Sequence, residues 1–380
     1  MPRCCGNELA YLKEVLEHEF RTSWTGTMVR RLEAAFSAKY GIKHAIALCN
    51  GTATLHSILA ARGIGPGDEV IVPALTMAST SLAVLHCGAV PVWADVDAET
   101  WTIDPDSIKE RLSDRTRAII TVSLYGCPPE MDKICEIAKK HSLFLVEDNA
   151  QCFLGYFKGK LAGTFGDAAS FSFQSSKHLT CGEGGIILTD NDELAQRIRE
   201  FSCLGYKSGY TKEQVQSPKY ERHHSLGYNY RMSDLQAAVA LAQVEQIDTL
   251  VAWRQRAAVN LIPQLGKWFT LQGGNPGTGW FARQAALDMD HSAWAVPALF
   301  DHPAVSWEQF SNRLRACGGN APYACWLPTY KEPMFRDWEY PDCYVAESIQ
   351  PRIMAFPTNY FCDEDIDRQC EALYSTVQSL

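Results

Sequence analysis

The order of apolar and amphipathic segments between residues 44 and 190 places the strongest limit on the fold. Short runs rich in valine and isoleucine alternate there with amphipathic stretches of helical length, a pattern typical of a parallel sheet covered by helices. Strands are predicted at 44–49, 68–73, 89–96, 116–126, 143–151, 166–173 and 184–191. Helices are predicted at 52–63, 81–88, 131–142 and 192–205. The pattern changes at the last two strands, which only a loop separates.

The rest of the sequence predicts an excursion, a long helix and a second domain. Residues 205–228 are polar, rich in tyrosine and without periodicity, so they are expected to be functional or interfacial if they are not simply mobile. Residues 232–265 form one alanine-rich amphipathic pattern, which predicts a long helix leading into a second domain. The chain ends in a predicted helix with Cys362 or Asp363 near its N-cap. We expect a large domain over 1–250 and a small one over 251–380.

Composition and charge argue against several classes of protein. The net charge is -9 and no block of lysine or arginine is present, which disfavours a nucleic-acid partner. The longest apolar stretches are too short to span a bilayer. None of the 14 cysteines lies in a C-x-x-C pair, no apolar signal segment begins the chain, and no H-E-x-x-H or other ligand spacing occurs. We expect a soluble cytoplasmic protein with reduced thiols and no metal site.

A candidate anion site lies in the stretch CNGTATLHS, residues 49–57. Gly51 permits a tight turn between a predicted strand and a predicted helix, whose N-terminal N–H groups and dipole attract an anion. Alternatively, Asn50 or Thr52 only caps the helix, and this stretch alone does not decide between the two interpretations. The pattern G-x-x-x-x-G-K-[ST] is absent and GEGG leads into a strand, so neither a P-loop nor a dinucleotide fingerprint is supported.

Two ionisable residues lie near predicted strand ends. Asp148 follows an apolar strand, at the edge where open parallel sheets bind ligands. It could cap the next helix, bind a sugar hydroxyl, or keep a pyridine nitrogen protonated. Lys177, which has no carboxylate close in sequence, is either a solvated lysine or a nucleophilic amine whose pKa is lowered by burial. Their spacing allows both groups to face one ring from neighbouring strands.

Five stretches, in order over roughly the first 250 residues, resemble the DegT/DnrJ/EryC1/StrS family of pyridoxal-phosphate-dependent sugar aminotransferases. They are GTATLHSILAARGIGPGDEVIVPALT, GAVPVWADVDAETWTID, VEDNAQ, GTFGDAASFSFQSSKHLTCGEGG and LGYNYRMSDLQAA, with a weaker echo at FPTNYFCDEDID. The resemblance implies the aspartate-aminotransferase type I fold. In that α/β fold a mainly parallel seven-stranded sheet forms a large α/β/α domain with an N-terminal helical arm, and a smaller α+β domain follows at the C-terminus.

The resemblance also implies roles around the cofactor ring. Lys177 would form an imine with the aldehyde of pyridoxal 5'-phosphate and then move the proton between Cα and C4′. Asp148 would pair with the pyridine nitrogen, and Gln151 would form a hydrogen bond with the phenolic oxygen. Met77 lies where family members usually have an aromatic residue against the ring, and Phe153 lies where many have a histidine. Neither difference removes a group that the chemistry requires.

The phosphate group of the cofactor is assigned by the same resemblance. Thr52 and Ala53 would present backbone N–H groups, and Ser172 would add a hydroxyl. Asn229 would reach the phosphate bound by the neighbouring subunit, which implies a homodimer with shared active sites.

We therefore predict an aminotransferase in amino-sugar biosynthesis. It would take an amino group from glutamate or glutamine, pass through the pyridoxamine 5'-phosphate form, and aminate a keto-sugar linked to a nucleotide. The alternatives are an inosose or keto-octulosonate acceptor, a related dehydratase, and a non-catalytic, cofactor-binding regulatory protein. Dehydratases of the family have histidine in place of Lys177, which favours transamination.

For two features outside the motifs, the sequence does not decide between a binding role and a structural one. The aromatic segment 322–340 could stack a sugar or base, or serve core and interface packing. Several cations in and after the excursion could bind a phosphorylated substrate or form a solvated loop. They are Lys207, Arg222, His223, His224 and Arg231.

Overall fold

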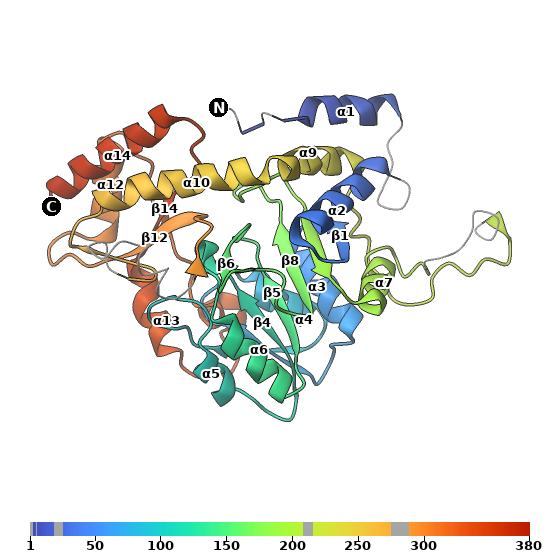
Figure 1. Cartoon of the computed structure of the whole chain (residues 1–380). Helices are drawn as coiled ribbons and strands as arrows, with labels where there is room; N and C mark the ends of the chain where they lie inside the picture. Colours follow the sequence, from blue (N-terminus) through green and yellow to red (C-terminus); the bar gives the residue numbers. More distant parts are fainter. Residues whose placement is uncertain (1–2, 5, 19–25, 208–215, 275–288) are drawn as a thin grey trace.

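A seven-stranded sheet forms the centre of the computed structural model, which describes residues 3–4, 6–18, 26–207, 216–274 and 289–380 (Figure 1). Its order is β1-β9-β8-β5-β4-β2-β3, and β9 alone runs against the other strands. The strands are β1 (His44–Leu48), β2 (Glu69–Pro73), β3 (Val90–Ala94), β4 (Thr116–Val122), β5 (Phe144–Asp148), β8 (Ala168–Ser172) and β9 (Gly185–Thr189). The predicted mainly parallel sheet is confirmed.

Helices cover both faces of this sheet and give the predicted α/β/α layers (Figure 1). Successive strand residues face opposite layers, so Ile46 and Leu48 pack toward one set of helices and Ala45 and Ala47 toward the other. The first set is α3 (Gly51–Arg62), α4 (Ser79–His86) and α7 (Asp192–Phe201). The second set is α2 (Thr27–Tyr40), α5 (Pro105–Glu110), α6 (Met131–Lys140) and α9 (Asp234–Glu245). Helix α1 (Glu8–Glu17) lies against α9.

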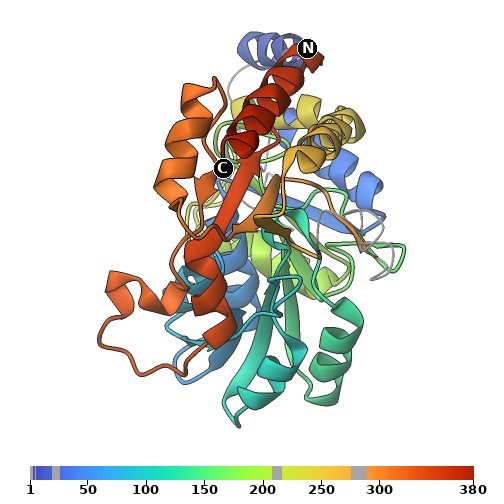
Figure 2. The same cartoon turned by 90° about the vertical axis from the view of Figure 1, so that its left-hand side faces the viewer.

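The C-terminal part is an α+β unit, as predicted. Its antiparallel sheet has the order β10-β12-β14-β13, and α12 and α14 pack beside it (Figure 2). The strands are β10 (Phe269–Leu271), β12 (Ala295–Phe300), β13 (Tyr323–Ala324) and β14 (Ile353–Pro357). The helices are α10 (Ile247–Leu261), α12 (Trp307–Ala316), α13 (Tyr344–Ile349) and α14 (Asp363–Gln378). A small sheet of order β11-β6-β7 joins Met289–Asp290, Tyr156–Phe157 and Lys160–Leu161.

The predicted single helix over 232–265 differs from the structure, which has α9 and α10 in nearly the same direction (Figure 1). The break is at Gln246, whose φ of -106° and ψ of 13° end α9. Ser233 starts α9 with a reciprocal capping box to Gln236.

Two further predictions concern the C-terminal part. Cys362, one of the two residues predicted near the N-cap of the last helix, is the N-cap residue of α14. The predicted domain boundary at 250–251 lies within α10 and stays a prediction.

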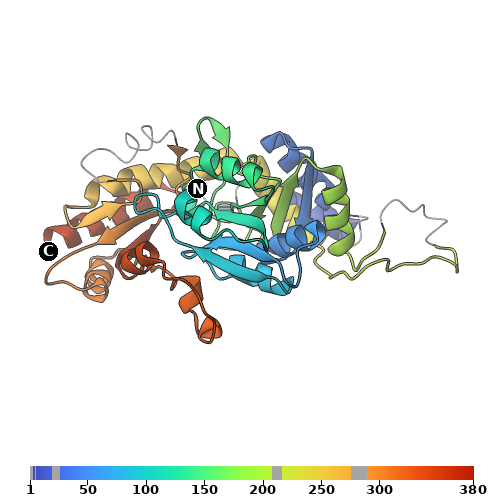
Figure 3. The ribbon, with the colours of Figure 1, turned by 90° about the horizontal axis from the view of Figure 1, so that it is seen from below.

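The predicted excursion leaves the body of the molecule between α7 and α9 (Figures 1 and 3). An isolated bridge pairs Tyr206 with His223 inside it, and a second one, Cys203 with Asn229, closes its base. Among the residues that the structure describes, no helix combines the length and the apolar character that crossing a membrane requires.

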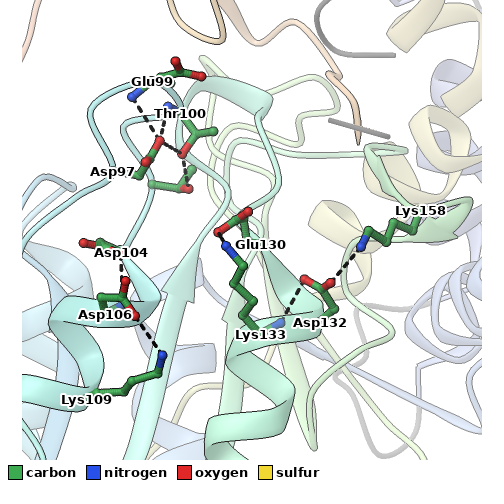
Figure 4. A network of polar contacts seen from close by, with 11 residues as sticks. Asp97, Glu99, Thr100, Asp104, Asp106, Lys109, Glu130, Asp132, Lys133 and Lys158 are labelled. Carbon is green, nitrogen blue, oxygen red and sulfur yellow. Dashed lines mark hydrogen bonds and ion pairs between the residues drawn. The ribbon is translucent and has the colours of Figure 1, made fainter. Parts of the chain in front are cut away.

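A polar turn ties the large sheet to the C-terminal unit. Asp97 accepts hydrogen bonds from the N–H groups of Glu99 and Thr100 and from the Thr100 hydroxyl (Figure 4). The carbonyls of the same two residues accept from Gly273 N–H, at 2.7 Å, and from Gln272 Nε2, at 2.6 Å. Three ion pairs drawn beside the turn involve exposed side chains and contribute little stability. They are Asp106–Lys109, Glu130–Lys133 and Asp132–Lys158.

We expect Gly185→Ala to destabilise the fold, because β9 passes directly against the turn before α3. A Cβ at Gly185 would lie 2.7 Å from the carbonyl carbon and oxygen of Asn50, and 2.9 Å from the nitrogen of Gly51. These are backbone atoms, so the free energy of unfolding, measured by urea denaturation, should fall by about 1–3 kcal/mol. Gly65→Ala is the matched control, since its nearest neighbour would be 3.9 Å away. Equal stability of Gly185→Ala and wild type would contradict this account.

Candidate active site

A cavity of about 860 Å³ opens where several strands of the large sheet end. Val122, Asp148 and Ser172 are the last residues of β4, β5 and β8, and all three line it. This is the edge at which open parallel sheets bind ligands. The cavity brings together seven of the eight predicted cofactor-binding residues. They are Thr52, Ala53, Met77, Asp148, Gln151, Ser172 and Lys177.

The excursion contributes none of its predicted binding residues to this cavity. Asn229, the eighth predicted residue, is exposed and lies outside the lining of its own chain's cavity. Arg231 is half-buried and donates to the sulfur of Cys203, at 3.5 Å. The other predicted cations are exposed and also lie outside the lining. They are Lys207, Arg222, His223 and His224. Within one chain, the solvated-loop interpretation of these cations fits.

The turn before α3 is both capped and able to bind an anion. Asn50 Oδ1 accepts from Ala53 N–H at 2.8 Å, so the predicted Asn50 cap is present and this N–H already has a partner. The N–H groups of Gly51 and Thr52 have no partner within the described residues, and they point out of the positive end of the helix. A Cβ on Gly51 would lie 3.1 Å from Cβ of Ser172. Glycine therefore lets the turn and the Ser172 hydroxyl approach each other.

Asp148 is a buried carboxylate at the end of β5. It accepts from Thr80 Oγ1 at 2.9 Å and from Ala150 N–H at 3.1 Å. Burial raises the pKa of Asp148, while these hydrogen bonds and the charge of Lys177 oppose the rise. A second cation in the cavity, such as a protonated pyridine nitrogen, would stabilise the ionised carboxylate.

Lys177 lies half-buried in the loop between β8 and β9. Burial lowers the pKa of Lys177 to about 8; the carboxylates of Asp148 and Glu183 oppose this, and the charge of Arg254 adds to it. Its Nζ lies 5.4 Å from the ring centroid of Trp294. The solvated-lysine interpretation does not fit this environment, whereas a nucleophilic amine does.

Gln151 presents a hydrogen-bond donor to the cavity. Its Oε1 accepts from Tyr125 N–H at 2.7 Å, so the amide group that remains for a ligand is the NH₂. A donor there suits an anionic phenolic oxygen. Phe153 is fully buried and lies outside the cavity lining. Four features of the cavity together fit pyridoxal phosphate. They are the acceptor at Asp148, the donor at Gln151, the free N–H groups before α3 and the amine of Lys177.

Four stacked aromatic side chains, here called the aromatic wall, also line the cavity. Tyr125 stacks on Trp294 and Trp326, with ring centroids 6.0 and 6.2 Å apart, and Trp294 stacks on Tyr323 at 6.2 Å. Tyr323 and Trp326 belong to the segment 322–340, whose role the sequence left open. Tyr125 and Trp294 carry no motif that would have singled them out. Such faces can stack a sugar ring or a base.

Comparison with known proteins agrees with this geometry. GDP-perosamine synthase of Caulobacter vibrioides is 35% identical over 98% of this chain and 96% of that protein. GDP-perosamine synthase of Escherichia coli O157:H7 is 38% identical over the same shares, 98% and 96%. The X-ray structure of the aminotransferase from Psychrobacter cryohalolentis has a TM-score of 0.88 and 28% identity, and the match covers 98% of this chain and 96% of that one.

The family model gives the same result for almost the whole chain. It matches residues 3–374, a span that includes both the large sheet and the C-terminal unit. The aspartate-aminotransferase type I fold expected from the sequence is thereby confirmed. With its sheet, its cavity and these relatives in agreement, the chain belongs to the DegT/DnrJ/EryC1/StrS aminotransferase family of pyridoxal-phosphate-dependent sugar aminotransferases.

Proposed function

We propose that this enzyme moves an amino group from glutamate or glutamine to the keto group of a nucleotide-linked sugar. The observation that carries the proposal is one cavity lined by Lys177, by Asp148 and by the aromatic wall. Its volume of about 860 Å³ leaves room for a sugar beside a cofactor. Two relatives named for a GDP-linked product, at 35% and 38% identity over 98% of this chain, support the nucleotide link.

Enzymes of this family depend on pyridoxal phosphate. When bound, this cofactor supplies an aldehyde that takes up an amino group and a ring that accepts the electrons left when a neighbouring carbon loses its proton. Asp148 would hold its pyridine nitrogen and Gln151 its phenolic oxygen. Thr52 N–H and the Ser172 hydroxyl would hold its phosphate, and the thioether of Met77 would pack on its ring. Ala53 N–H could join them only by leaving Asn50.

The chain's own residues then bind, orient and move protons. Because the pKa of Lys177 is about 8 instead of 10.5, its neutral fraction near pH 7 is roughly 300-fold higher than that of an ordinary lysine. A neutral Nζ can take a proton from the carbon that bears the amino group and return it to C4′ of the cofactor, on the other side of the nitrogen. The carboxylate of Asp148 would keep the pyridine nitrogen protonated, and the aromatic wall would help to exclude water from this transfer.

We further infer a homodimer with shared sites. Asn229 is exposed and outside its own cavity, although it directly precedes Tyr230, which lines the cavity. Its exposed amide, at the base of the excursion, is available to the phosphate site of a second copy, as the partner subunit's Asn229 would be here.

Replacing Lys177 by alanine should abolish transfer without unfolding the protein. Loss of the group that moves the proton predicts a turnover about 10² to 10⁴ times lower, measured with glutamate and keto-sugars linked to GDP. The visible absorbance of added pyridoxal phosphate should also no longer bleach to that of the pyridoxamine form when glutamate is added. Lys139→Ala, at an exposed position of α6, is the control. Wild-type turnover in Lys177→Ala would contradict the proposed role of Lys177.

Asp148→Asn should keep the hydrogen bond from Thr80 but lose the charge. The pyridine nitrogen of the bound cofactor would then lose its proton about 1–3 pH units lower, which absorbance titration measures, and turnover should fall about 10- to 1000-fold. Asp132→Asn, an exposed control on α6, should change neither value. An unchanged titration in Asp148→Asn would show that this carboxylate does not pair with the ring.

Mixing two inactive variants tests the shared site. If the partner subunit's Asn229 completes each site, a mixed dimer of Lys177→Ala and Asn229→Ala chains contains one intact site. Refolding the two variants together should then restore roughly a quarter of wild-type turnover. Recovery no greater than the sum of the separate variants would place Asn229 in its own chain's site, or outside any site.

A further inference from the structure

Arg254, on α10, is a fully buried residue. Its guanidinium holds the backbone of residues 175–178, here called the lysine loop, which lie between β8 and β9. Its Nη2 donates to the carbonyls of Ser176 and Lys177, at 2.9 and 2.8 Å. Its Nη1 donates to the carbonyl of Trp294 at 2.9 Å and to Thr358 Oγ1 at 3.3 Å. Within the part of the chain that the structure describes, no carboxylate pairs with Arg254. Its side chain is 1% exposed.

A second guanidinium reaches the same loop from the N-terminal arm. Arg3 Nη1 donates to the carbonyl of Ser175 at 2.7 Å, and Nη2 donates to the carbonyls of Lys177 and, at 3.4 Å, His178. Arg3 also lacks a carboxylate partner among the described residues. Burial lowers its pKa. Burial, and next the charge of Arg3, lower the pKa of Arg254 to about 9.

Holding a loop with two arginines that have no carboxylate partner costs free energy. Buried arginines are normally paired with carboxylates, because an unpaired buried charge costs free energy. Here four successive carbonyls, those of residues 175–178, take the place of the acid. The loop lies outside β8 and β9, so no strand pairing fixes its conformation and these bonds contribute to it. The indole N–H of Trp294 also donates to the Ser176 carbonyl, at 2.9 Å.

We propose that Arg3 and Arg254, here called the guanidinium clamp, are positioning residues of the transfer reaction. They hold the backbone of residues 175–178, so that the side chain of Lys177 leaves the loop in the direction that the reaction needs. The inference rests on the role given to Lys177 in the proposed function. It assigns the N-terminal arm and α10, which lie outside the catalytic motifs, a part in the chemistry.

The clamp also acts on Lys177 by charge. Burial is the main reason that the pKa of Lys177 lies near 8. Of the charged groups that face it, Arg254 lowers this pKa further, whereas Asp148 and Glu183 raise it. Arg254 therefore combines an orienting and an electrostatic effect, whereas Arg3 acts through its hydrogen bonds to the backbone of the loop.

Labelling of the apoprotein separates these effects from a merely structural role. The rate at which acetic anhydride acetylates Lys177, followed by peptide mass spectrometry from pH 6 to 11, gives the titration midpoint of this amine, expected near 8. Arg254→Met should raise the midpoint by about one pH unit, and Arg254→Lys and Arg3→Met should leave it in place. All three variants should weaken the visible circular dichroism of added pyridoxal phosphate, because the lysine that holds it is less well oriented.

Arg256→Met is the matched control, since Arg256 lies on the same helix and pairs with exposed Asp363. It should change neither signal. If far-ultraviolet circular dichroism shows that Arg254→Met does not fold, Arg254→Lys and the half-buried Arg3 carry the test through the visible signal. Wild-type visible circular dichroism in the folded variants would overturn the proposal. The labelling needs neither donor nor sugar, so its failure leaves the proposed function standing, whereas turnover in Lys177→Ala would overturn that function.

Discussion

The burial of an amine beside a buried carboxylate is the constraint on which this structure depends. Because β5 and β8 pair in parallel, Asp148 lies opposite Ser170, and the loop that follows β8 brings Lys177 into the same cavity. Burial lowers the pKa of Lys177 and raises that of Asp148, so it makes the charged form of each group more costly than in water. A cofactor with an aldehyde and a basic ring nitrogen resolves both, since it binds the neutral amine covalently and brings a cation to the carboxylate.

The rest of the fold keeps these groups in place. The reversed strand β9 lies with Gly185 directly against the turn at Asn50 and Gly51, so this turn and the loop between β8 and β9 belong to one packed unit. The C-terminal unit contributes Trp294 to the cavity, and α10 contributes Arg254 to the loop. Residues far apart in the sequence therefore line this cavity or contact the loop that carries Lys177.

Much of this was predictable from the sequence, and the failures have physical reasons. Alternating apolar runs reveal strands because each buried strand shows the pattern locally, and the matched motifs located Asp148 and Lys177. The break at Gln246 was missed, because the apolar periodicity continues across it. Tyr125 and Trp326 could not be assigned, since buried aromatics indicate a core as readily as a binding wall. Arg254 reads as an ordinary polar helix residue, and its burial follows only from tertiary packing.

The most direct test of the central claim is to find which amine captures the cofactor. Pyridoxal phosphate is added to the purified protein, the complex is reduced with borohydride, and the modified peptide is identified by mass spectrometry. The account predicts one pyridoxyl group, attached to Lys177, and a modification rate that rises with pH and levels off above about 8. Attachment to a different lysine, or none at all, would contradict it.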